Sequence, residues 1–292
     1  RLYQLEEIPQ NIVVVGESSI AIELAQFFNL IDRNVTLLVP YNRMMPMADE
    51  YLANWMLNKL QNDKIQVIFN SYDIADTSHF EGNYLIVGDH KVACDIVINS
   101  KLRQGVIPPC EIPLDVKEGF IVTNEFLQTN YPNILAIGDV NGRLMFAHSA
   151  SAQGYQAINF IKGIKEEIDI SKVPLNMYSL PEVAQIGPTE AQLKAQGLQY
   201  RVTEYPLSTN GKALCEGNTE GFIRILSEAK YGQVLGVQII AANATDMISE
   251  ASAFMQVEAT IFDVAKTVHA HPTISEVFME AGFKAVEEAK NQ

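Results

Sequence analysis

Near the C-terminal end, two histidines and a carboxylate occur in the segment His269-Ala270-His271-Pro272-Thr273-Ile274-Ser275-Glu276. His271 and Glu276 are five residues apart, on either side of a break marked by Pro272, and an amphipathic, helix-like stretch follows. An imidazole can remove a proton from a thiol or hydroxyl near neutral pH, and a nearby carboxylate can orient it. The spacing fits a base with its orienting group, or a purely structural pair, so the surrounding elements must decide between them.

The composition excludes several classes of protein. The 292 residues are 48% hydrophobic and 19% charged, which suits about two well-packed domains, and the net charge is -14. An acidic balance of this size argues against nucleic acid or an anionic membrane surface as the main partner. No apolar run approaches the roughly 20 residues that a membrane-spanning helix needs.

Cysteine usage indicates a reducing compartment. Cys94, Cys110 and Cys215 are odd in number and far apart, as expected for free thiols in the cytoplasm. No pair has CxxC or CxxxxC spacing, and we expect no metal site. The chain opens on a polar, acidic stretch without an initiator Met, so we expect neither a signal peptide nor a complete gene product.

The N-terminal part of the chain has the pattern of a Rossmann-like nucleotide-binding domain. Residues 11–15 form a continuous β-branched run, typical of a strand covered on both faces, and residues 35–39 form a second one. Between them, Gly16 ends the first strand, and Ser18 or Ser19 is placed to cap an apolar helix. This order predicts the start of a doubly wound parallel sheet. We expect further elements as follows: a helix over 49–61 and strands over 65–69, 84–87 and 95–98.

The turn after the first strand stands where a Rossmann fold carries the dinucleotide fingerprint G-x-G-x-x-G. Its sequence is Gly16-Glu17-Ser18-Ser19-Ile20-Ala21. Gly16 is kept, Ser18 replaces the glycine that lets a diphosphate approach, and Ala21 is a tolerated third residue. Glu17 places a negative charge beside the diphosphate position, and Val39 replaces the acidic residue that would hold the adenosine ribose. The architecture favours NAD binding, whereas these departures favour a decayed site. The choice between NAD and NADP stays open.

A second ligand site is predicted in the middle of the chain. Residues 133–140 have the pattern of a short buried strand that ends in Gly138 and Asp139. A carboxylate at the carboxyl end of a strand can accept a hydrogen bond from a ribityl hydroxyl, and ligands bind at that end of such sheets. A Gly-Asp pair alone is also an ordinary turn.

The C-terminal part alternates strands with helices, which predicts an α+β domain built on an antiparallel sheet. Thr189 and Glu190 begin a helix with a capping pattern, and Gly197 ends it. We expect strands over 220–225 and 232–239 and a longer helix over 246–260.

In order along the chain, several segments resemble those of the pyridine nucleotide–disulfide oxidoreductases, and among them the dihydrolipoyl dehydrogenases. Residues 136–140 are similar to the A-I-G-D-V flavin motif of that family, and residues 145–150 to its M-L-A-H-K-A segment. Residues 178–187 are similar to Y-T-x-P-E-I-A-x-V-G, and residues 269–276 to H-A-H-P-T-x-S-E. The resemblance implies three parts: an NAD(P)-binding domain over 1–106, a return segment of a FAD domain over 107–172 and a dimerisation domain over 173–292.

The same resemblance implies roles for individual residues. His271 would be the base that deprotonates a dihydrolipoamide thiol, Glu276 would orient it, and His269 would be structural. The C-terminal domain would form a homodimer in which the base serves the partner's site. The implied NAD contacts are Gly16, Ser18, Ala21 and Glu23, and the implied FAD contacts are Gly138, Asp139, Met145, Ala147 and His148.

Two departures from the family bear on function. Residues 100–104 replace its Gly-Arg-Arg-Pro-Asn segment, and neither its Gly-rich flavin loop nor its CxxxxC disulfide is encoded in these 292 residues. We therefore predict a flavin-dependent oxidoreductase that converts dihydrolipoamide and NAD to lipoamide and NADH, present here as a fragment that is inactive alone. Its substrate would be the lipoyl group of a 2-oxoacid dehydrogenase complex. The alternatives are a non-catalytic dimerisation module with a decayed nucleotide site, or a reductase of another disulfide.

Overall fold

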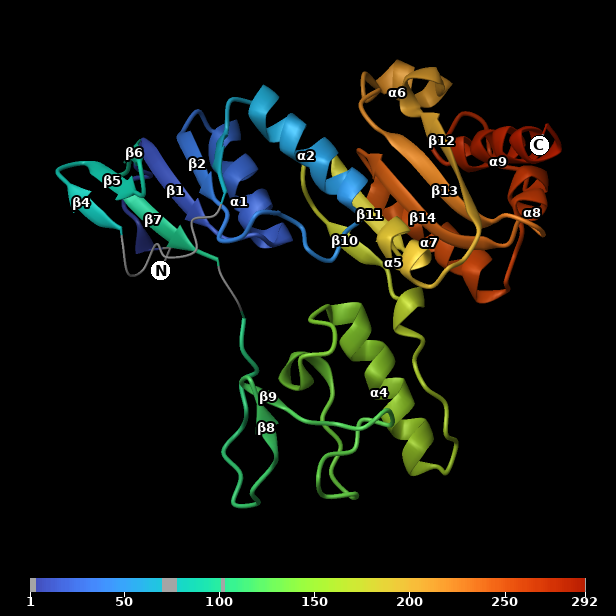
Figure 1. Ribbon diagram of the computed structural model, residues 1–292, viewed down its shortest axis with the longest axis horizontal. Coiled ribbons are helices and arrows are strands. Elements are labelled where there is room, and N and C mark those ends of the chain that lie inside the picture. Colours follow the sequence, from blue (N-terminus) through green and yellow to red (C-terminus); the bar gives the residue numbers. More distant parts are fainter. Residues whose placement is uncertain (1–3, 70–77, 101–102, 292) are drawn as a thin grey trace. The chain divides into compact units, whose positions relative to one another are not determined.

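A computed structural model describes residues 4–69, 78–100 and 103–291 (Figure 1). The chain divides into two units, and each is described by itself. The first unit joins residues 1–101 to residues 174–292, and the second consists of residues 102–173. The N-terminal nucleotide-binding fold and the C-terminal sheet therefore form two lobes of one compact unit.

The N-terminal lobe contains a parallel sheet with the strand order β3-β2-β1-β7. Ile12 and Val14 of β1 pack into a core with α1 and α2, whereas Val13 and Val15 pack on the other face against a small antiparallel sheet. A strand covered on both faces needs apolar residues at every position, and this confirms the predicted β-α-β start of a doubly wound fold. The elements are β1 (Asn11–Val15), α1 (Ser19–Leu30), β2 (Asn34–Leu38), α2 (Glu50–Asn62), β3 (Gln66–Ile68) and β7 (Ile96–Asn99).

The small covering sheet has three antiparallel strands in the order β4-β5-β6. They are β4 (His79–Glu81), β5 (Tyr84–Val87) and β6 (His90–Ala93). Leu85, Val87 and Val92 turn toward the parallel sheet and form one core with it. The strand predicted over 84–87 therefore belongs to this second sheet and not to the parallel one.

The C-terminal lobe is a five-stranded antiparallel sheet in the order β10-β11-β14-β13-β12, with helices packed on it (Figure 1). Phe278 and Ala281 of α9 and Met247 of α7 lie in its core, which confirms the predicted α+β architecture. The capping box predicted at Thr189 is present, with Gln192 as its second member. The strands are β10 (Leu175–Met177), β11 (Glu182–Ile186), β12 (Tyr200–Pro206), β13 (Phe222–Glu228) and β14 (Val234–Ala241).

The helices of this lobe are α5 (Glu190–Ala195), α6 (Gly211–Glu216), α7 (Ala244–Gln256), α8 (Ile261–Lys266) and α9 (Glu276–Lys290). The helix expected over 246–260 thus starts and ends earlier, and a separate helix, α8, begins right after the Thr260 cap. Across residues 4–69, 78–100 and 103–291, no helix has the length and apolar character to cross a membrane.

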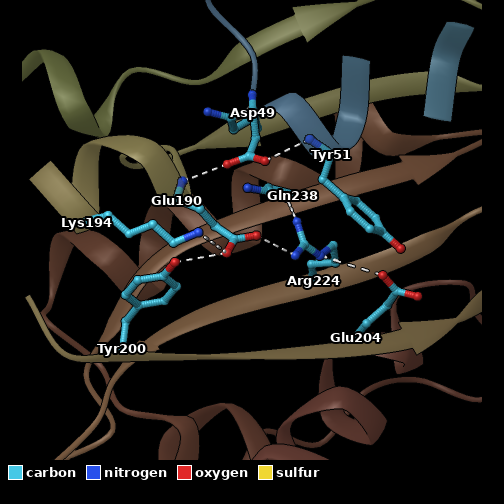
Figure 2. A network of polar contacts seen from close by, with 9 residues as sticks. Asp49, Tyr51, Glu190, Lys194, Tyr200, Glu204, Arg224 and Gln238 are labelled. Carbon is cyan, nitrogen blue, oxygen red and sulfur yellow. Dashed lines mark hydrogen bonds and ion pairs between the residues drawn. The ribbon is translucent and has the colours of Figure 1, made fainter. Parts of the chain in front are cut away.

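Buried polar side chains join the two lobes of the first unit (Figure 2). The carboxylate of Asp49, the N-cap of α2, accepts hydrogen bonds from the backbone N–H groups of Tyr51 and of Glu190, at 3.0 and 2.7 Å. Arg224 of β13 donates to Glu190 at 2.7 Å and to Gln238 at 2.6 Å. Its guanidinium lies 3.9 Å from the ring centroid of Tyr51 on the other lobe. One carboxylate therefore caps helices of both lobes, and one arginine contacts both.

The second unit contains little regular structure: β8 (Val116–Lys117), β9 (Phe120–Ile121), two short 3-10 turns, η2 (Gly138–Asn141) and η3 (Ile170–Lys172), and α4 (Ala147–Ile161). The strand predicted over 133–140 is wrong. Leu135 makes only an isolated bridge to Gln128, and η2 begins at Gly138. An apolar run becomes a strand only where neighbouring strands pair with its N–H and C=O groups, and within the described residues only the segment around Gln128 does so.

Candidate functional site

The structure brings His271 and Glu276 together at the start of α9. His271 Nδ1 lies 2.9 Å from Glu276 Oε1, and Glu276 Oε2 accepts a hydrogen bond from the backbone N–H of Thr273 at 2.8 Å. The Thr273 amide first, and His271 second, hold the pKa of Glu276 below its usual value. Glu276 is therefore an ionised acceptor near neutral pH. This assigns the proton to His271 Nδ1 and leaves Nε2 as the basic nitrogen.

The imidazole of His271 is open to an arriving group, because 80% of its side chain is exposed, against 16% for Glu276. Thr273 ties the loop down: its hydroxyl donates to the Ala270 carbonyl at 2.7 Å, and its carbonyl accepts from the Asn210 amide at 3.2 Å. A base held at Nδ1 and open at Nε2 has the arrangement needed to take a proton from a thiol.

The residues expected to contact NAD gather at the turn between β1 and α1 and on α1. Gly16 has φ +154°, and a Cβ there would lie 2.5 Å from Ser100 Oγ, so the close approach of β7 requires glycine. Ser18 is the N-cap of α1, but its side chain makes no capping hydrogen bond. Ala21 lies 3.1 Å from the same added Cβ, which is the close helix–strand packing that a small third residue permits. A helix start without a side-chain cap suits an anion such as a diphosphate.

The end of β2 offers nothing to an adenosine ribose. Val39 is fully buried, and its backbone N–H donates a hydrogen bond to the Ile68 carbonyl at 2.8 Å. Beside the diphosphate position, Glu17 Oε2 is buried without a hydrogen-bond partner among the described residues. The residues therefore fit the diphosphate of a dinucleotide in part and do not fit its ribose.

Glu23 of α1, which the resemblance places near the nicotinamide, also holds the two lobes together. One of its carboxylate oxygens accepts from the backbone N–H of Tyr178 at 2.9 Å, and burial raises the pKa of this carboxyl. One turn further on, the Gln26 side chain exchanges two hydrogen bonds with the backbone of Leu180, at 2.8 and 2.9 Å. The segment before β11 is thus fixed against α1.

The turn that carries Gly138 and Asp139, where the resemblance predicts flavin contacts, is called the flavin turn below. It is built by a buried amide network that the sequence did not indicate. The backbone N–H of Gly138 donates to Gln153 Oε1 at 2.8 Å, and Asn141 donates to the same oxygen at 2.7 Å. Asn141 also donates to the Ala136 carbonyl at 3.0 Å. Because Gln153 lies on α4, this network fixes η2 against the helix that follows it.

The other residues expected to contact FAD lie at the surface of this turn. The Asp139 side chain is 48% exposed, and Arg103 Nη1 lies 3.3 Å from one of its oxygens. Arg103 Nη2 also donates to the Met145 carbonyl at 2.7 Å. Ala147 and His148 open α4, whose first turn holds no acidic residue. An exposed carboxylate beside an uncapped helix start fits the ribityl chain and polar ring edge of a flavin.

Comparison with known proteins identifies the family of the chain. Residues 1–154 match the family described as pyridine nucleotide-disulphide oxidoreductase, and residues 173–282 match the dimerisation domain of pyridine nucleotide-disulphide oxidoreductases. The chain belongs to the pyridine nucleotide-disulphide oxidoreductases. Members of this family are enzymes, and the chain contains the domain by which they dimerise.

Individual members of the family match nearly the whole chain. Dihydrolipoyl dehydrogenase of Mycoplasma pneumoniae is 34% identical, over 97% of this chain and 63% of its own length. Dihydrolipoyl dehydrogenase of Bacillus subtilis is 33% identical, over 97% of this chain and 62% of its own length. The chain therefore spans less than two thirds of these relatives.

Solved structures of the family share the fold. LpdA from Mycobacterium tuberculosis superposes with a TM-score of 0.88 at 21% identity, over 97% of this chain and 63% of that one. The HOCl-induced flavoprotein disulfide reductase RclA from Escherichia coli superposes with a TM-score of 0.84 at 21% identity, over 97% of this chain and 66% of that one. At this identity the two structures support the fold alone.

The three cysteines of the chain form no disulfide in the structure. Cys94, Cys110 and Cys215 are all free thiols, with Cys94 buried and the other two exposed. In the described part of the chain, no three His, Cys, Asp or Glu side chains gather as metal ligands would.

Sequence reasoning missed several residues that build these sites: Thr273 and Asn210 in the loop of His271, and Arg103, Asn141 and Gln153 at the flavin turn. Of these residues, only Thr273 could have been anticipated from the sequence, because it lies two residues before Ser275, the N-cap of α9. Asn210 and Arg103 lie far in sequence from the residues that they contact, whereas Asn141 and Gln153 are 12 residues apart but carry no pattern that indicates their contact.

Proposed function

We propose that this chain supplies the nucleotide-binding and dimerisation parts, and the catalytic base, of a flavin-dependent disulfide oxidoreductase that oxidises dihydrolipoamide with NAD. The observation that carries the proposal is the hydrogen bond between His271 and Glu276, in an exposed loop that opens α9. Relatives named dihydrolipoyl dehydrogenase support the choice of substrate. The domains proposed are residues 1–106 for NAD(P), residues 107–172 for the return segment of the FAD domain and residues 173–292 for dimerisation.

In this reaction His271 removes the proton of a dihydrolipoamide thiol. Nε2 accepts the proton, and Glu276, already bound to Nδ1, stabilises the imidazolium that results. The thiolate so formed is the nucleophile for exchange with a disulfide. FAD, held through Asp139 and the Met145–His148 segment, would carry two electrons from the dithiol to NAD. In the overall balance, dihydrolipoamide and NAD⁺ give lipoamide, NADH and one proton.

The redox disulfide and the flavin diphosphate loop would come from polypeptide outside these 292 residues, since the three cysteines of the chain are separate free thiols. The protein would act as a homodimer through its dimerisation domain, with the lipoyl group of a 2-oxoacid dehydrogenase complex as partner. Three free thiols support a reducing, cytoplasmic location.

The test compares the holoprotein, carrying flavin and a redox disulfide, with its His271→Gln variant. Loss of a general base should lower the dihydrolipoamide–NAD rate by about 10²- to 10⁴-fold. Oxidation of NADH by an artificial electron acceptor does not need this proton transfer and should stay unchanged. A variant that keeps full activity with dihydrolipoamide would remove the basis of the proposal.

A second candidate is a dimerisation module without nucleotide chemistry, favoured by the buried Val39 and the unpartnered Glu17 oxygen. A fluorescence titration with NADH separates the two. Saturable binding supports the enzyme, and absence of binding supports the module. A third candidate is reduction of another disulfide, which activity assays with glutathione disulfide and other disulfides beside lipoamide would reveal.

A further inference from the structure

A second histidine–glutamate pair lies directly beside the first. His269, two residues before His271, is buried, with 6% of its side chain exposed. Its Nε2 lies 2.6 Å from Glu250 Oε1 on α7, and its Nδ1 lies 3.1 Å from the Thr267 carbonyl. The ring is parallel to that of Phe278 on α9, at 2° and 6.4 Å between centroids. Both ring nitrogens of this imidazole are therefore engaged, and its ring lies parallel to an aromatic ring of α9.

The partners fix which atoms carry protons. A backbone carbonyl only accepts, so His269 Nδ1 must donate to Thr267. Nε2 faces the Glu250 carboxylate in a short contact of 2.6 Å, so both ring nitrogens of His269 are engaged. His269 thus has no free nitrogen for catalysis, which distinguishes it from His271 with its exposed ring.

We propose that His269, clamped by Glu250, is a positioning residue that anchors the 267–273 loop and thereby keeps His271 Nδ1 on Glu276. The inference rests on the proposed function only for its effect on catalysis, since the contact between His269 and Glu250, called the clamp below, does not depend on any substrate. The loop is held at two places: near its start by the contact of His269 with Glu250, and at its end by the hydrogen bond between Thr273 and Glu276. His271, which lies between them, has 80% of its side chain exposed and is little restrained by packing.

Charged groups surround the clamp on each side. A cavity of about 350 Å³ separates α6, α7 and the loop, and it is bordered by Lys212 and Glu216 of α6 and by Asp246 and Glu250 of α7. Lys212 is paired with Glu216 at 2.8 Å. On the other side stands Glu276, whose pKa is lowered chiefly by the Thr273 amide and His271 and, to a smaller extent, by the charge of His269. The two pairs are therefore close enough to influence each other.

The experiment uses ¹⁵N-labelled 292-residue protein and reads the protonated nitrogen of His271 directly by two-bond ¹H–¹⁵N NMR. In the unaltered chain, His271 should show the Nδ1–H form that the Glu276 contact selects. In Glu250→Ala the clamp is lost, and the His271 signal should move toward the Nε2–H form. Glu250→Gln keeps a hydrogen-bonding group at this position, because its amide N–H donates to His269 Nε2, and should restore the original signal.

A matched control removes another histidine–glutamate contact of the same unit. Glu81→Ala breaks the exposed pair with His79, 3.4 Å apart, and should leave the His271 signal unchanged. Thermal unfolding confirms that each variant is folded. In the holoprotein, Glu250→Ala should lower kcat for dihydrolipoamide by about 10- to 100-fold, with KM unchanged, as a misplaced base does.

The outcomes are separable from those of the proposed function. A His271 signal that is the same in Glu250→Ala as in the unaltered chain overturns the clamp, whatever the enzyme does. A Glu250→Gln variant that behaves like Glu250→Ala overturns it too, because a hydrogen bond would then not be what holds the loop. A shifted signal in a protein that never oxidises dihydrolipoamide supports the clamp and rejects the proposed function.

Discussion

Replacement of Arg224 by methionine should be among the most destabilising single changes in the first unit. The Arg224 side chain is 7% exposed and lies between both lobes, with Glu190 at 2.7 Å and Gln238 at 2.6 Å (Figure 2). Glu204 lies 3.6 Å from its Nε, and the Tyr51 ring 3.9 Å from its guanidinium. Methionine can fill the space of the aliphatic stem but donates no hydrogen bond, so Glu190 and Gln238 lose their donor and the Tyr51 ring of the other lobe loses its cation.

The magnitude follows from the burial of the partners. Removing one member of a fully buried ion pair costs about 3–5 kcal/mol, because the remaining charge stays uncompensated. Glu190 keeps 24% of its side chain exposed and retains a hydrogen bond from Tyr200, so water and tyrosine offset part of this cost. We therefore expect Arg224→Met to lower the free energy of unfolding by about 2–4 kcal/mol.

The loss should depend on pH in a defined direction. Burial alone would raise the pKa of Glu190, but hydrogen bonds from Arg224 and Tyr200 hold it below its usual value. A depressed carboxyl pKa stabilises the fold above the unfolded value, about 4.3 for glutamate, and this stability is lost as pH falls through the folded pKa. The difference between the unaltered protein and Arg224→Met should thus be full at neutral pH and shrink below about pH 4.

Trp55 provides the assay, because it is the one tryptophan of the chain and lies at the same contact between lobes. Its ring meets Phe222 edge-on at 6.4 Å between centroids. Urea unfolding followed by Trp55 fluorescence reports the free energy of unfolding of the unit that contains this contact. As a control, Lys290→Met removes an exposed positive charge and should change the free energy by less than about 0.5 kcal/mol.

A double-mutant cycle with Glu190→Gln identifies the interaction that is responsible. Contacting charged residues should show a coupling energy of about 1–3 kcal/mol between Arg224→Met and Glu190→Gln. If Arg224→Met unfolds at the same urea concentration as the unaltered protein, Arg224 does not stabilise the unit, and if the two changes are additive, its pairing with Glu190 is not the interaction responsible.

Three further predictions concern single sites. A Cβ at Gly221 would lie 1.9 Å from the Ile240 carbonyl oxygen, so Gly221→Ala should lower the free energy of unfolding by about 3 kcal/mol or more. Gly217→Ala, with open space around it, should lower it by about 1 kcal/mol. Equal thermal midpoints for the two variants would contradict this. Gln153→Leu removes the acceptor of the Gly138 N–H and should lower the local stability of η2 by about 1–3 kcal/mol. This loss should be seen as faster hydrogen exchange of the η2 amides, and unchanged exchange would contradict the network. Glu17→Gln removes a charge beside the diphosphate position and should tighten NADH binding by roughly fivefold, or about 1 kcal/mol, in a fluorescence titration; weaker binding would count against the placement of the diphosphate.

Features set by local pattern were predictable from the sequence. The apolar run of β1 is readable because both faces of the strand are covered, and the capping box at Thr189 is a property of four consecutive residues. The contact between His271 and Glu276 spans five residues of one loop, so the spacing already places both groups within reach.

Features set by distant segments were not predictable. Asp49 and Glu190 meet across 141 residues, and nothing near either one indicates the other. Glu250 is separated from His269 by 19 residues and the whole of α8, so the clamp has no sequence signature. The strand expected over 133–140 failed for the same reason, since a strand depends on partners that the apolar run itself does not specify.

The most direct test of the catalytic assignment is the anaerobic reduction of the flavin by dihydrolipoamide in the holoprotein, followed by loss of the visible flavin band in a stopped-flow instrument. We predict complete bleaching in the unaltered protein, slowed by at least about 100-fold in His271→Gln at equal flavin content. Bleaching at the same rate in both proteins would show that His271 does not transfer the thiol proton, and no bleaching in either would show that the holoprotein does not oxidise dihydrolipoamide.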